Sequence, residues 1–194
     1  ITLKGRCICT ALFFMLKKLM KISEHITDKV SVDYFFITGK IDLNAEYFIN
    51  KIKESCQSED NMNYKTNIQS LMTPFKFFSQ DQNFLNLLQN FIELIDNNYN
   101  FASYHVTDAW GFEVKKNENT KYHAHARSIW SGVLYLNSST QELKFPEINK
   151  SVKPERGVFV LFSPFLMHGC EPNKEEISKF GISFNLEEAL PKKW

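Results

Sequence analysis

The sequence predicts a mostly β protein in which N-terminal helices pack against a jelly-roll barrel. Three observations lead to this prediction. The apolar residues follow helical spacing from about residue 20 to 100 and then fall into short strands separated by Gly, Pro and Asn. Several short strands at this spacing are typical of a sandwich or barrel. A chain of 194 residues that is 43% hydrophobic can bury one core. We therefore expect a single domain over residues 1–194, with a mainly helical support region at 1–100 and the β core at 101–190.

Two helices are expected in the first hundred residues. The segment NAEYFINKIKES predicts one helix with Tyr47, Phe48 and Ile52 on its apolar side, after a strand in VDYFFITGKI. The segment QDQNFLNLLQNFIELIDNNY predicts a second helix, because apolar residues recur there at intervals of three and four. Its apolar stripe comprises Phe84, Leu87, Leu88, Phe91, Leu94 and Ile95. The polar segment SEDNMNYKTN between the helices is expected to be a loop.

The apolar run CICTALFFML near the start is too short for a bilayer, which needs about twenty residues. Lys17 and Lys18 follow it where a signal peptide would have small residues. Two interpretations stay open: the first fourteen residues are an addition outside the natural domain, or they form an ordinary element packed on the core.

Charge and cysteine content narrow the expected partners. The net charge of +1, from 23 basic and 22 acidic residues, gives no large field for nucleic acid or an anionic membrane. Small molecules or peptide segments are therefore the expected partners. The four cysteines form no C-x-x-C pair, so we expect free thiols in a reducing cytoplasm. The oligomeric state is left open, a homodimer included.

The second half of the chain predicts strand after strand, each bounded by turn residues. The predicted strands lie in FASYHVTDAWGFEV, SIWSGVLYLN, GVFVLFS and KFGISFNLE, and the turns lie in KNENTK, NSST, KPERG and EPNKEE.

Three histidines in this half are candidate metal ligands. His123 and His125 are two apart in KYHAHARSIW, and residues two apart on a strand point to the same face. His168 follows a strand that Pro164 ends, so the third imidazole can turn toward the barrel mouth. Three imidazoles bind Fe(II), Zn(II), Cu(II) or Ni(II) and leave coordination positions open, as a catalytic metal requires. His25 and His105 are interpreted as structural.

The segments HAHARSIWSGVLYLN, VKPERGVFVLFSPFLMHGCEP and KFGISFNL resemble the small iron and 2-oxoglutarate-dependent oxygenases of marine bacteria and phages. That family has H-x-H, then SGV-x-YL, a distal His, and a basic residue before I-S-F-N. With a weaker likeness around NIQSLMTPFKFF, the resemblance covers about two thirds of the chain. It implies a double-stranded β-helix and an oxygenase that uses Fe(II) and 2-oxoglutarate, hydroxylates a substrate and releases succinate and CO2.

The resemblance also implies a role for each histidine. His123 matches the first ligand and His168 the distal one, while His125 stands where the wider superfamily has a carboxylate. Three neutral ligands leave Fe(II) its two positive charges, which dianionic 2-oxoglutarate would neutralise. Whether His125 is itself a ligand stays open.

The resemblance implies that Lys179, eleven residues after His168, binds the distal carboxylate of 2-oxoglutarate, because the superfamily has an Arg or Lys at this place. Strand alternation places Lys179, Gly181, Ser183 and Asn185 on one face, which can line the barrel, and Phe180, Ile182 and Phe184 on the other. Tyr135 is a further candidate for the same carboxylate, and Ser183 completes the expected co-substrate site. The alternative is that Lys179 is a solvated lysine at a strand end.

Weaker candidates remain for the mouth of the barrel and for the metal. Trp110, Arg127 and Trp130 either line the mouth or cap the barrel, and Asp108 is a carboxylate that could approach the metal from an adjacent strand. Two other functions are weighed against the oxygenase: a cupin-type metalloenzyme and a catalytically silent ligand-binding barrel. A cupin normally has a Glu shortly after the H-x-H pair, whereas here the next Glu is Glu142.

Overall fold

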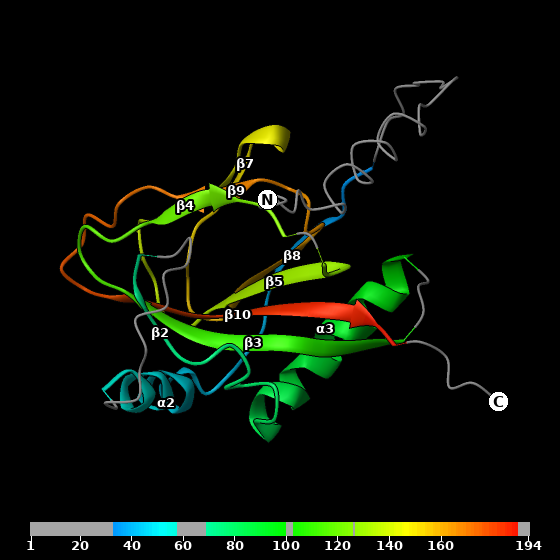
Figure 1. The fold of residues 1–194 in the computed structure, drawn as a ribbon, viewed down its shortest axis with the longest axis horizontal. Helices are drawn as coiled ribbons and strands as arrows, with labels where there is room; N and C mark the ends of the chain where they lie inside the picture. Colours follow the sequence, from blue (N-terminus) through cyan, green and yellow to red (C-terminus); the bar gives the residue numbers. More distant parts are fainter. Residues whose placement is uncertain (1–32, 58–68, 100–102, 126, 190–194) are drawn as a thin grey trace, which may run out of the picture. The chain divides into compact units, whose positions relative to one another are not determined.

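The computed structural model describes residues 33–57, 69–99, 103–125 and 127–189 (Figure 1). From Tyr34 onward the chain forms one compact unit. The first fourteen residues and the SEDNMNYKTN segment lie outside the described residues, as does His25. Of the helices in the described part, none has the length and apolar character that crossing a membrane requires.

Strands of the described residues form two antiparallel sheets. The larger sheet has the order β1 (Phe36–Lys40), β8 (Val158–Phe162), β5 (Trp130–Tyr135), β10 (Lys179–Glu188), β3 (Tyr104–Val114) and β2 (Leu71–Met72). The smaller sheet has the order β4 (Thr120–His123), β9 (His168–Cys170), β6 (Leu143–Phe145) and β7 (Lys150–Val152). A short 3-10 helix, η1 (Pro146–Ile148), joins β6 to β7. The mostly β prediction is confirmed.

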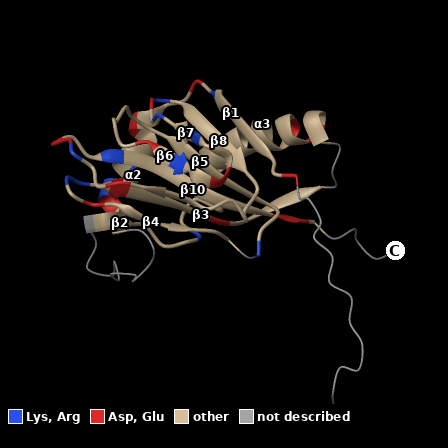
Figure 2. Ribbon diagram, turned by 90° about the horizontal axis from the view of Figure 1, so that it is seen from above, with Lys and Arg blue, Asp and Glu red and all other residues tan. Residues whose placement is uncertain are grey.

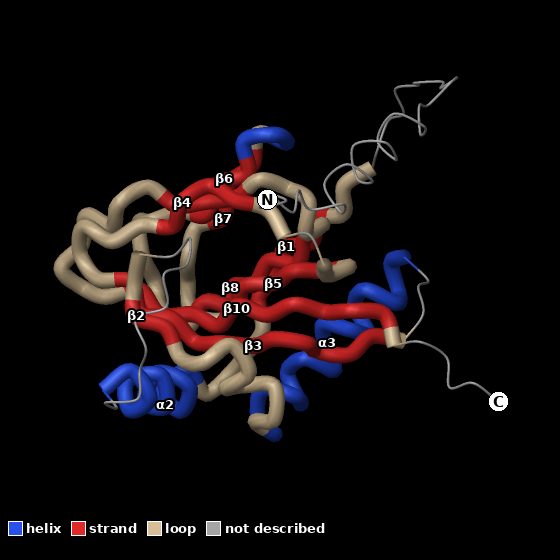
Figure 3. The backbone as a smooth tube through the Cα atoms, in the orientation of Figure 1, coloured by secondary structure: helices blue, strands red, loops and turns tan. Residues whose placement is uncertain are grey.

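Two helices, α2 (Ala45–Gln57) and α3 (Gln82–Tyr99), cover one face of the larger sheet, and the smaller sheet lies over its other face (Figure 3). Both helices were predicted from their apolar spacing. Helix α3 buries the expected stripe, with Phe84, Leu88, Phe91 and Ile95 inside. It begins at a capping residue, because the Asp81 carboxylate accepts the backbone N–H of Phe84 at 3.1 Å.

The two faces of the larger sheet bury separate apolar cores. Phe180, Ile182 and Phe184 of β10 pack with the helices, and so does Trp130 of β5. Aromatic and aliphatic side chains of both sheets, including Tyr135, fill the space between the sheets. The alternation predicted for β10 is therefore observed, with the apolar face toward the helices.

One glycine allows helix α2 to approach the larger sheet closely. A Cβ atom on Gly111 of β3 would lie 2.3 Å from Cγ1 of Ile52, which is too close for any side chain. Because position 111 has no side chain, Ile52 packs directly on the strand and is fully buried.

The N-terminal region contributes more than helices. Strands β1 and β2 belong to the larger sheet, so the sheet draws on both halves of the chain. The division into a support region and a β core near residue 100 stays a prediction. Acidic and basic residues are interspersed along the described ribbon (Figure 2), in keeping with the net charge of +1.

Candidate metal centre

The three predicted ligands come together between the two sheets. His123 is the last residue of β4 and pairs with His168, the first residue of β9, across the ladder. His125 lies beyond the end of β4, which corrects the prediction that both histidines share one strand. The backbone N–H of His125 donates to the carbonyl of Pro164 at 2.7 Å and so ties the two loops together.

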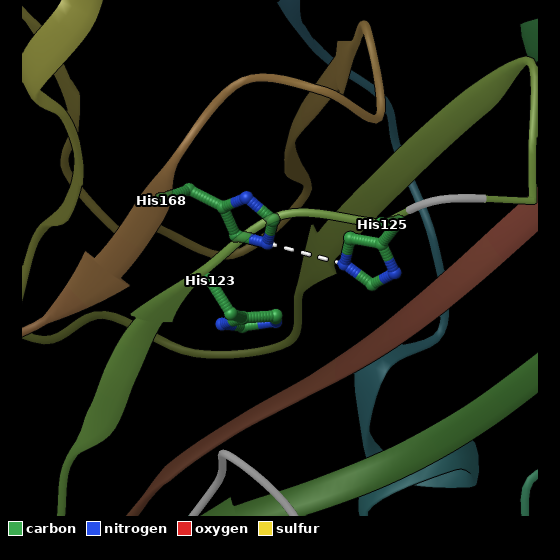
Figure 4. A group of neighbouring side chains, drawn as sticks. All are labelled: His123, His125 and His168. Carbon is green, nitrogen blue, oxygen red and sulfur yellow. Dashed lines mark hydrogen bonds between the residues drawn. The ribbon is translucent and has the colours of Figure 1, made fainter. Parts of the chain in front are cut away.

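The imidazole nitrogens are close enough to share one ion. One nitrogen from each of the three rings lies within 4.8 Å of the others, and the rings converge in Figure 4. Nε2 of His125 and Nε2 of His168 are 3.3 Å apart. Two nitrogens bound to a metal at about 2.1 Å are roughly 3 to 3.5 Å apart for angles between 90° and 109°. In the described residues no carboxylate belongs to this group.

Backbone carbonyls set the tautomers of two rings. Nδ1 of His123 lies 2.7 Å from the carbonyl of Lys121, and Nδ1 of His168 lies 2.9 Å from the carbonyl of Leu166. A carbonyl oxygen only accepts hydrogen bonds, so each Nδ1 carries the proton. The lone pair of both rings is therefore on Nε2, which is available to a metal.

Burial keeps the three imidazoles neutral. It lowers the pKa of His168 to about 3 and that of His125 to about 4, and it lowers the pKa of His123 as well. The neighbouring rings lower the pKa of His125 and His168 further, because two imidazolium charges repel. Neutral imidazole is the form that binds a metal ion.

Aromatic packing fixes the ring of His168. The ring of Phe162 meets it edge to face at 4.7 Å between centroids, and Phe145 lies at 5.8 Å. Since only 4% of His168 is exposed, its ring orientation is set by the core before any ligand arrives.

The histidines open onto a pocket between the sheets that also contains Lys179. Its lining residues are Trp110, Phe112, Val114, Thr120, His123, His125, Ser131, Gly132, Val133, Tyr135, Leu143, Phe162, His168, Lys179, Ser183, Phe184 and Asn185. All three residues predicted for the co-substrate, Lys179, Tyr135 and Ser183, are in this lining. The alternative of a solvated lysine at position 179 is excluded, because Lys179 is 2% exposed.

The Lys179 ammonium is buried without an acidic partner in the described part of the chain. Nζ donates to the carbonyl of Gln141 at 3.4 Å and to Sγ of Cys170 at 3.6 Å, and it lies 5.9 Å from the Tyr135 ring centroid. Burial lowers the pKa of Lys179, and the contact with Cys170 offsets part of that effect. A buried cation held only by weak acceptors favours an anionic ligand.

Two polar residues of the pocket had no role assigned to them from the sequence. Ser131 and Asn185 are cross-strand partners in the β5–β10 ladder, and the Ser131 hydroxyl donates to Oδ1 of Asn185 at 2.8 Å. The strand period could have identified Ser131, because Ser131, Val133 and Tyr135 alternate along one face of β5.

Of the weaker candidates from the sequence, one lines the pocket and three do not. Trp110 lines the pocket. Trp130 is fully buried on the helix side, and Arg127 is exposed, so neither lines it. Asp108 is paired with Asn185 on β3 but is absent from both the pocket lining and the histidine group.

Comparisons with known proteins identify a fold and no family. No description of a protein family matches the chain, and no curated protein matches it in sequence. Solved structures do match. The viral collagen prolyl hydroxylase of Paramecium bursaria Chlorella virus-1, in complex with 2-oxoglutarate, is 14% identical with a TM-score of 0.63, over 80% of this chain and 96% of that one.

Two further structures point the same way. SnoK, a non-heme α-ketoglutarate-dependent carbocyclase of nogalamycin biosynthesis, is 9% identical with a TM-score of 0.65, over 79% of each chain. HygX of Streptomyces hygroscopicus, with nickel and 2-oxoglutarate, is 10% identical with a TM-score of 0.59, over 82% of this chain and 85% of that one. The chain has the fold of 2-oxoglutarate-dependent oxygenases. Because a hydroxylase and a carbocyclase share it, the fold alone does not fix the reaction.

Proposed function

We propose that the protein is an Fe(II)- and 2-oxoglutarate-dependent oxygenase that hydroxylates a small molecule or a peptide. One observation carries the proposal: three convergent neutral histidines and one buried lysine without an acidic partner among the described residues line the same pocket. A cation and a set of imidazoles in one pocket suit a ligand that binds a metal at one end and a lysine at the other. 2-Oxoglutarate has such groups, a keto acid at one end and a carboxylate at the other.

The donor set fits ferrous iron. His123 and His168 would bind it through Nε2, because their Nδ1–H groups are engaged by backbone carbonyls. His125 would be the third ligand, with its Nε2 already 3.3 Å from that of His168. Imidazole is a good ligand for Fe(II), and three protein ligands leave positions for other molecules. All three ligands are uncharged, so the dianionic co-substrate balances the charge of the ion.

The pocket walls would hold and orient the co-substrate. Lys179 would pair with its distal carboxylate, and Ser183, on the same face of β10, would donate a hydrogen bond. Burial raises the pKa of the Tyr135 hydroxyl well above 10.0, so this hydroxyl keeps its proton and can donate as well. Phe112, Val114 and Leu143 would exclude water from the pair of charges, which strengthens their attraction.

Bound iron would supply the oxidation: 2-oxoglutarate and O2 react there, one oxygen atom enters succinate as CO2 leaves, and the other hydroxylates the substrate. The protein's own part is to bind, to orient and to keep the site dry. His168 and Lys179 are both buried, so the groups that would hold the two ends of the co-substrate are in place before it binds.

Two finer points belong to the same proposal. The two facing sheets would be the halves of a double-stranded β-helix, or jelly roll, as the H-x-H and I-S-F-N segments imply. The same segments support membership of the small oxygenases of marine bacteria and phages. They also favour a hydroxylation reaction over the ring-forming reaction of a carbocyclase.

The proposal is tested by following 2-oxoglutarate in the presence of Fe(II), ascorbate and O2. We expect conversion to succinate that requires both iron and oxygen, because the proposed reaction consumes 2-oxoglutarate and O2 at the metal. The His168→Ala variant should form none, while His105→Ala, changed at an exposed position outside the pocket, should match the wild type. Succinate formation in His168→Ala equal to that of the wild type would contradict the proposal.

A further inference from the structure

The pocket extends along β10 beyond the reach of the co-substrate. Lys179 and Asn185 both line it and are six residues apart on the strand. At about 3.3 Å per residue, their Cα atoms are about 20 Å apart. A five-carbon dicarboxylate, with bonds of about 1.5 Å, spans roughly 7 Å. A co-substrate whose distal carboxylate meets Lys179 therefore leaves the Asn185 end to another molecule.

At that end a hydroxyl chain fixes the side-chain amide of Asn185. The Ser131 hydroxyl donates its one hydrogen to Oδ1 of Asn185 at 2.8 Å, so Ser128, at 3.4 Å, must be the donor to Ser131. The oxygen of the amide is thereby engaged. Its Nδ2 group donates no hydrogen bond to any residue that the structure describes, although Asn185 is only 9% exposed.

A second unused donor lies beside it. Trp110 of β3 is paired with Ser183, so it stands diagonal to Asn185 on the pocket face of the sheet. Trp110 is 5% exposed, and its indole Nε1 has no acceptor within the described residues. A buried N–H without an acceptor is destabilising, and the indole N–H of a buried tryptophan usually has a hydrogen-bond partner. Two residues on the same face of the larger sheet thus carry N–H donors that have no acceptor in the described part of the chain.

The described lining of the pocket offers no carboxylate to a cation. No lining residue of the pocket, among those described, is an Asp or a Glu, and Lys179 is the basic residue of the lining. Asp108, the cross-strand partner of Asn185 on β3, is absent from this lining. Apolar side chains such as Val133 and Phe112 supply most of the remaining wall. The ligand that fits is neutral, largely apolar and equipped with an acceptor oxygen.

We propose that the Asn185 end of the pocket is a substrate subsite for a neutral carbonyl oxygen, bound by Nε1–H of Trp110 and Nδ2–H of Asn185. Carboxamides, including the peptide group, are the substrate class that this pair of donors selects. The binding of a carbonyl oxygen at this end does not depend on the proposed function. The further statement that the bound molecule is the one oxidised does rest on it.

The test uses two probes with the same tail and different heads, pentanamide and pentylammonium. The full chain, labelled with 15N and supplied with Zn2+ and 2-oxoglutarate, is titrated while the indole N–H resonance of Trp110 is followed. The Trp110→Phe variant identifies that resonance by its absence. Pentanamide should shift it saturably and pentylammonium should leave it in place. No response to pentanamide, or an equal response to pentylammonium, overturns the proposal.

Two substitutions assign the donors. Trp110→Phe keeps a ring but removes the N–H, and Asn185→Asp keeps an oxygen for Ser131 but replaces the NH2 group by an acceptor. Each substitution should lower the affinity for pentanamide about fivefold, which corresponds to the loss of one neutral hydrogen bond. Ligand-observed NMR measures this affinity. Asn185→Asp should also gain pentylammonium binding. The matched control Asn90→Asp, on the exposed side of α3, should change neither affinity.

The same two variants can also contradict the proposal. Unchanged pentanamide affinity in Trp110→Phe overturns it, even where Asn185→Asp does not fold. A parallel titration of 2-oxoglutarate separates the two proposals. If pentanamide binds at Trp110 and 2-oxoglutarate does not bind, the oxygenase proposal is overturned and the subsite proposal stands. If 2-oxoglutarate binds and pentanamide does not, only the subsite proposal is overturned.

Discussion

At the scale of single residues, the three histidines should differ in how they respond to substitution. His123→Ala and His168→Ala should each abolish stoichiometric Fe(II) binding, because each removes an Nε2 lone pair that a backbone carbonyl has oriented. His125→Asp should retain iron, since a carboxylate oxygen is also a ligand for Fe(II). Iron content after anaerobic loading and gel filtration measures this, with thermal unfolding as the control for the fold. Full iron loading in His168→Ala would remove that residue from the metal site.

Lys179 is the residue on which co-substrate affinity should depend most. Lys179→Met leaves the distal carboxylate of 2-oxoglutarate buried and unpaired, a loss on the order of 3–5 kcal/mol. Affinity should fall by about two to three orders of magnitude, at roughly 1.4 kcal/mol per tenfold. Calorimetry under nitrogen on iron-loaded protein measures it, and Lys144→Met, at an exposed position of β6, is the matched control. Equal affinities in the wild type and Lys179→Met would exclude the role given to Lys179.

At the scale of elements, the start of helix α3 depends on Asp81. Its carboxylate accepts hydrogen bonds from Tyr47 at 2.8 Å, from Lys51 at 2.6 Å and from the backbone of Phe84. Burial alone would raise the pKa of Asp81, but these hydrogen bonds outweigh it and the pKa lies below 3.8. The stabilisation is therefore present above about pH 4 and is lost as the pH falls through the lowered pKa.

Asp81→Ala should lower the free energy of unfolding at pH 7 by about 2 kcal/mol, because it removes a helix cap and a buried acceptor. Asp81→Asn, which keeps an oxygen for Phe84, should lose less. Urea unfolding at pH 7 and at pH 3 measures the difference from wild type, which should shrink at the lower pH. A difference that grows on acidification would contradict this assignment.

Sequence patterns predicted the long elements and missed the short ones for a physical reason. The stripes of α2 and α3 and the alternation of β10 were readable because each element repeats its period several times. Strands β4, β6, β7 and β9 have three or four residues, too few for a period to appear. Two of them hold His123 and His168, so the ligands were predicted from residue type while their cross-strand pairing was not.

At the scale of the whole molecule, the fold places a cation and three imidazoles in one pocket from distant parts of the chain. The histidines come from the smaller sheet and its loops, whereas Lys179 comes from the larger sheet, so the pocket exists only when the two sheets face each other. Asn185 and Ser131, on neighbouring strands of the larger sheet, also come from distant parts of the chain. Their hydrogen bond joins residues 54 apart in sequence, and no local pattern predicts it.

The central claim is that one pocket binds Fe(II) and 2-oxoglutarate together. Adding Fe(II) and then 2-oxoglutarate to the full chain under nitrogen, while recording the visible absorption spectrum, tests it most directly. We expect a new visible band that requires both additions, saturates at one equivalent of iron and is missing in His168→Ala. A wild-type spectrum that 2-oxoglutarate leaves unchanged, or the same band in His168→Ala, would contradict it.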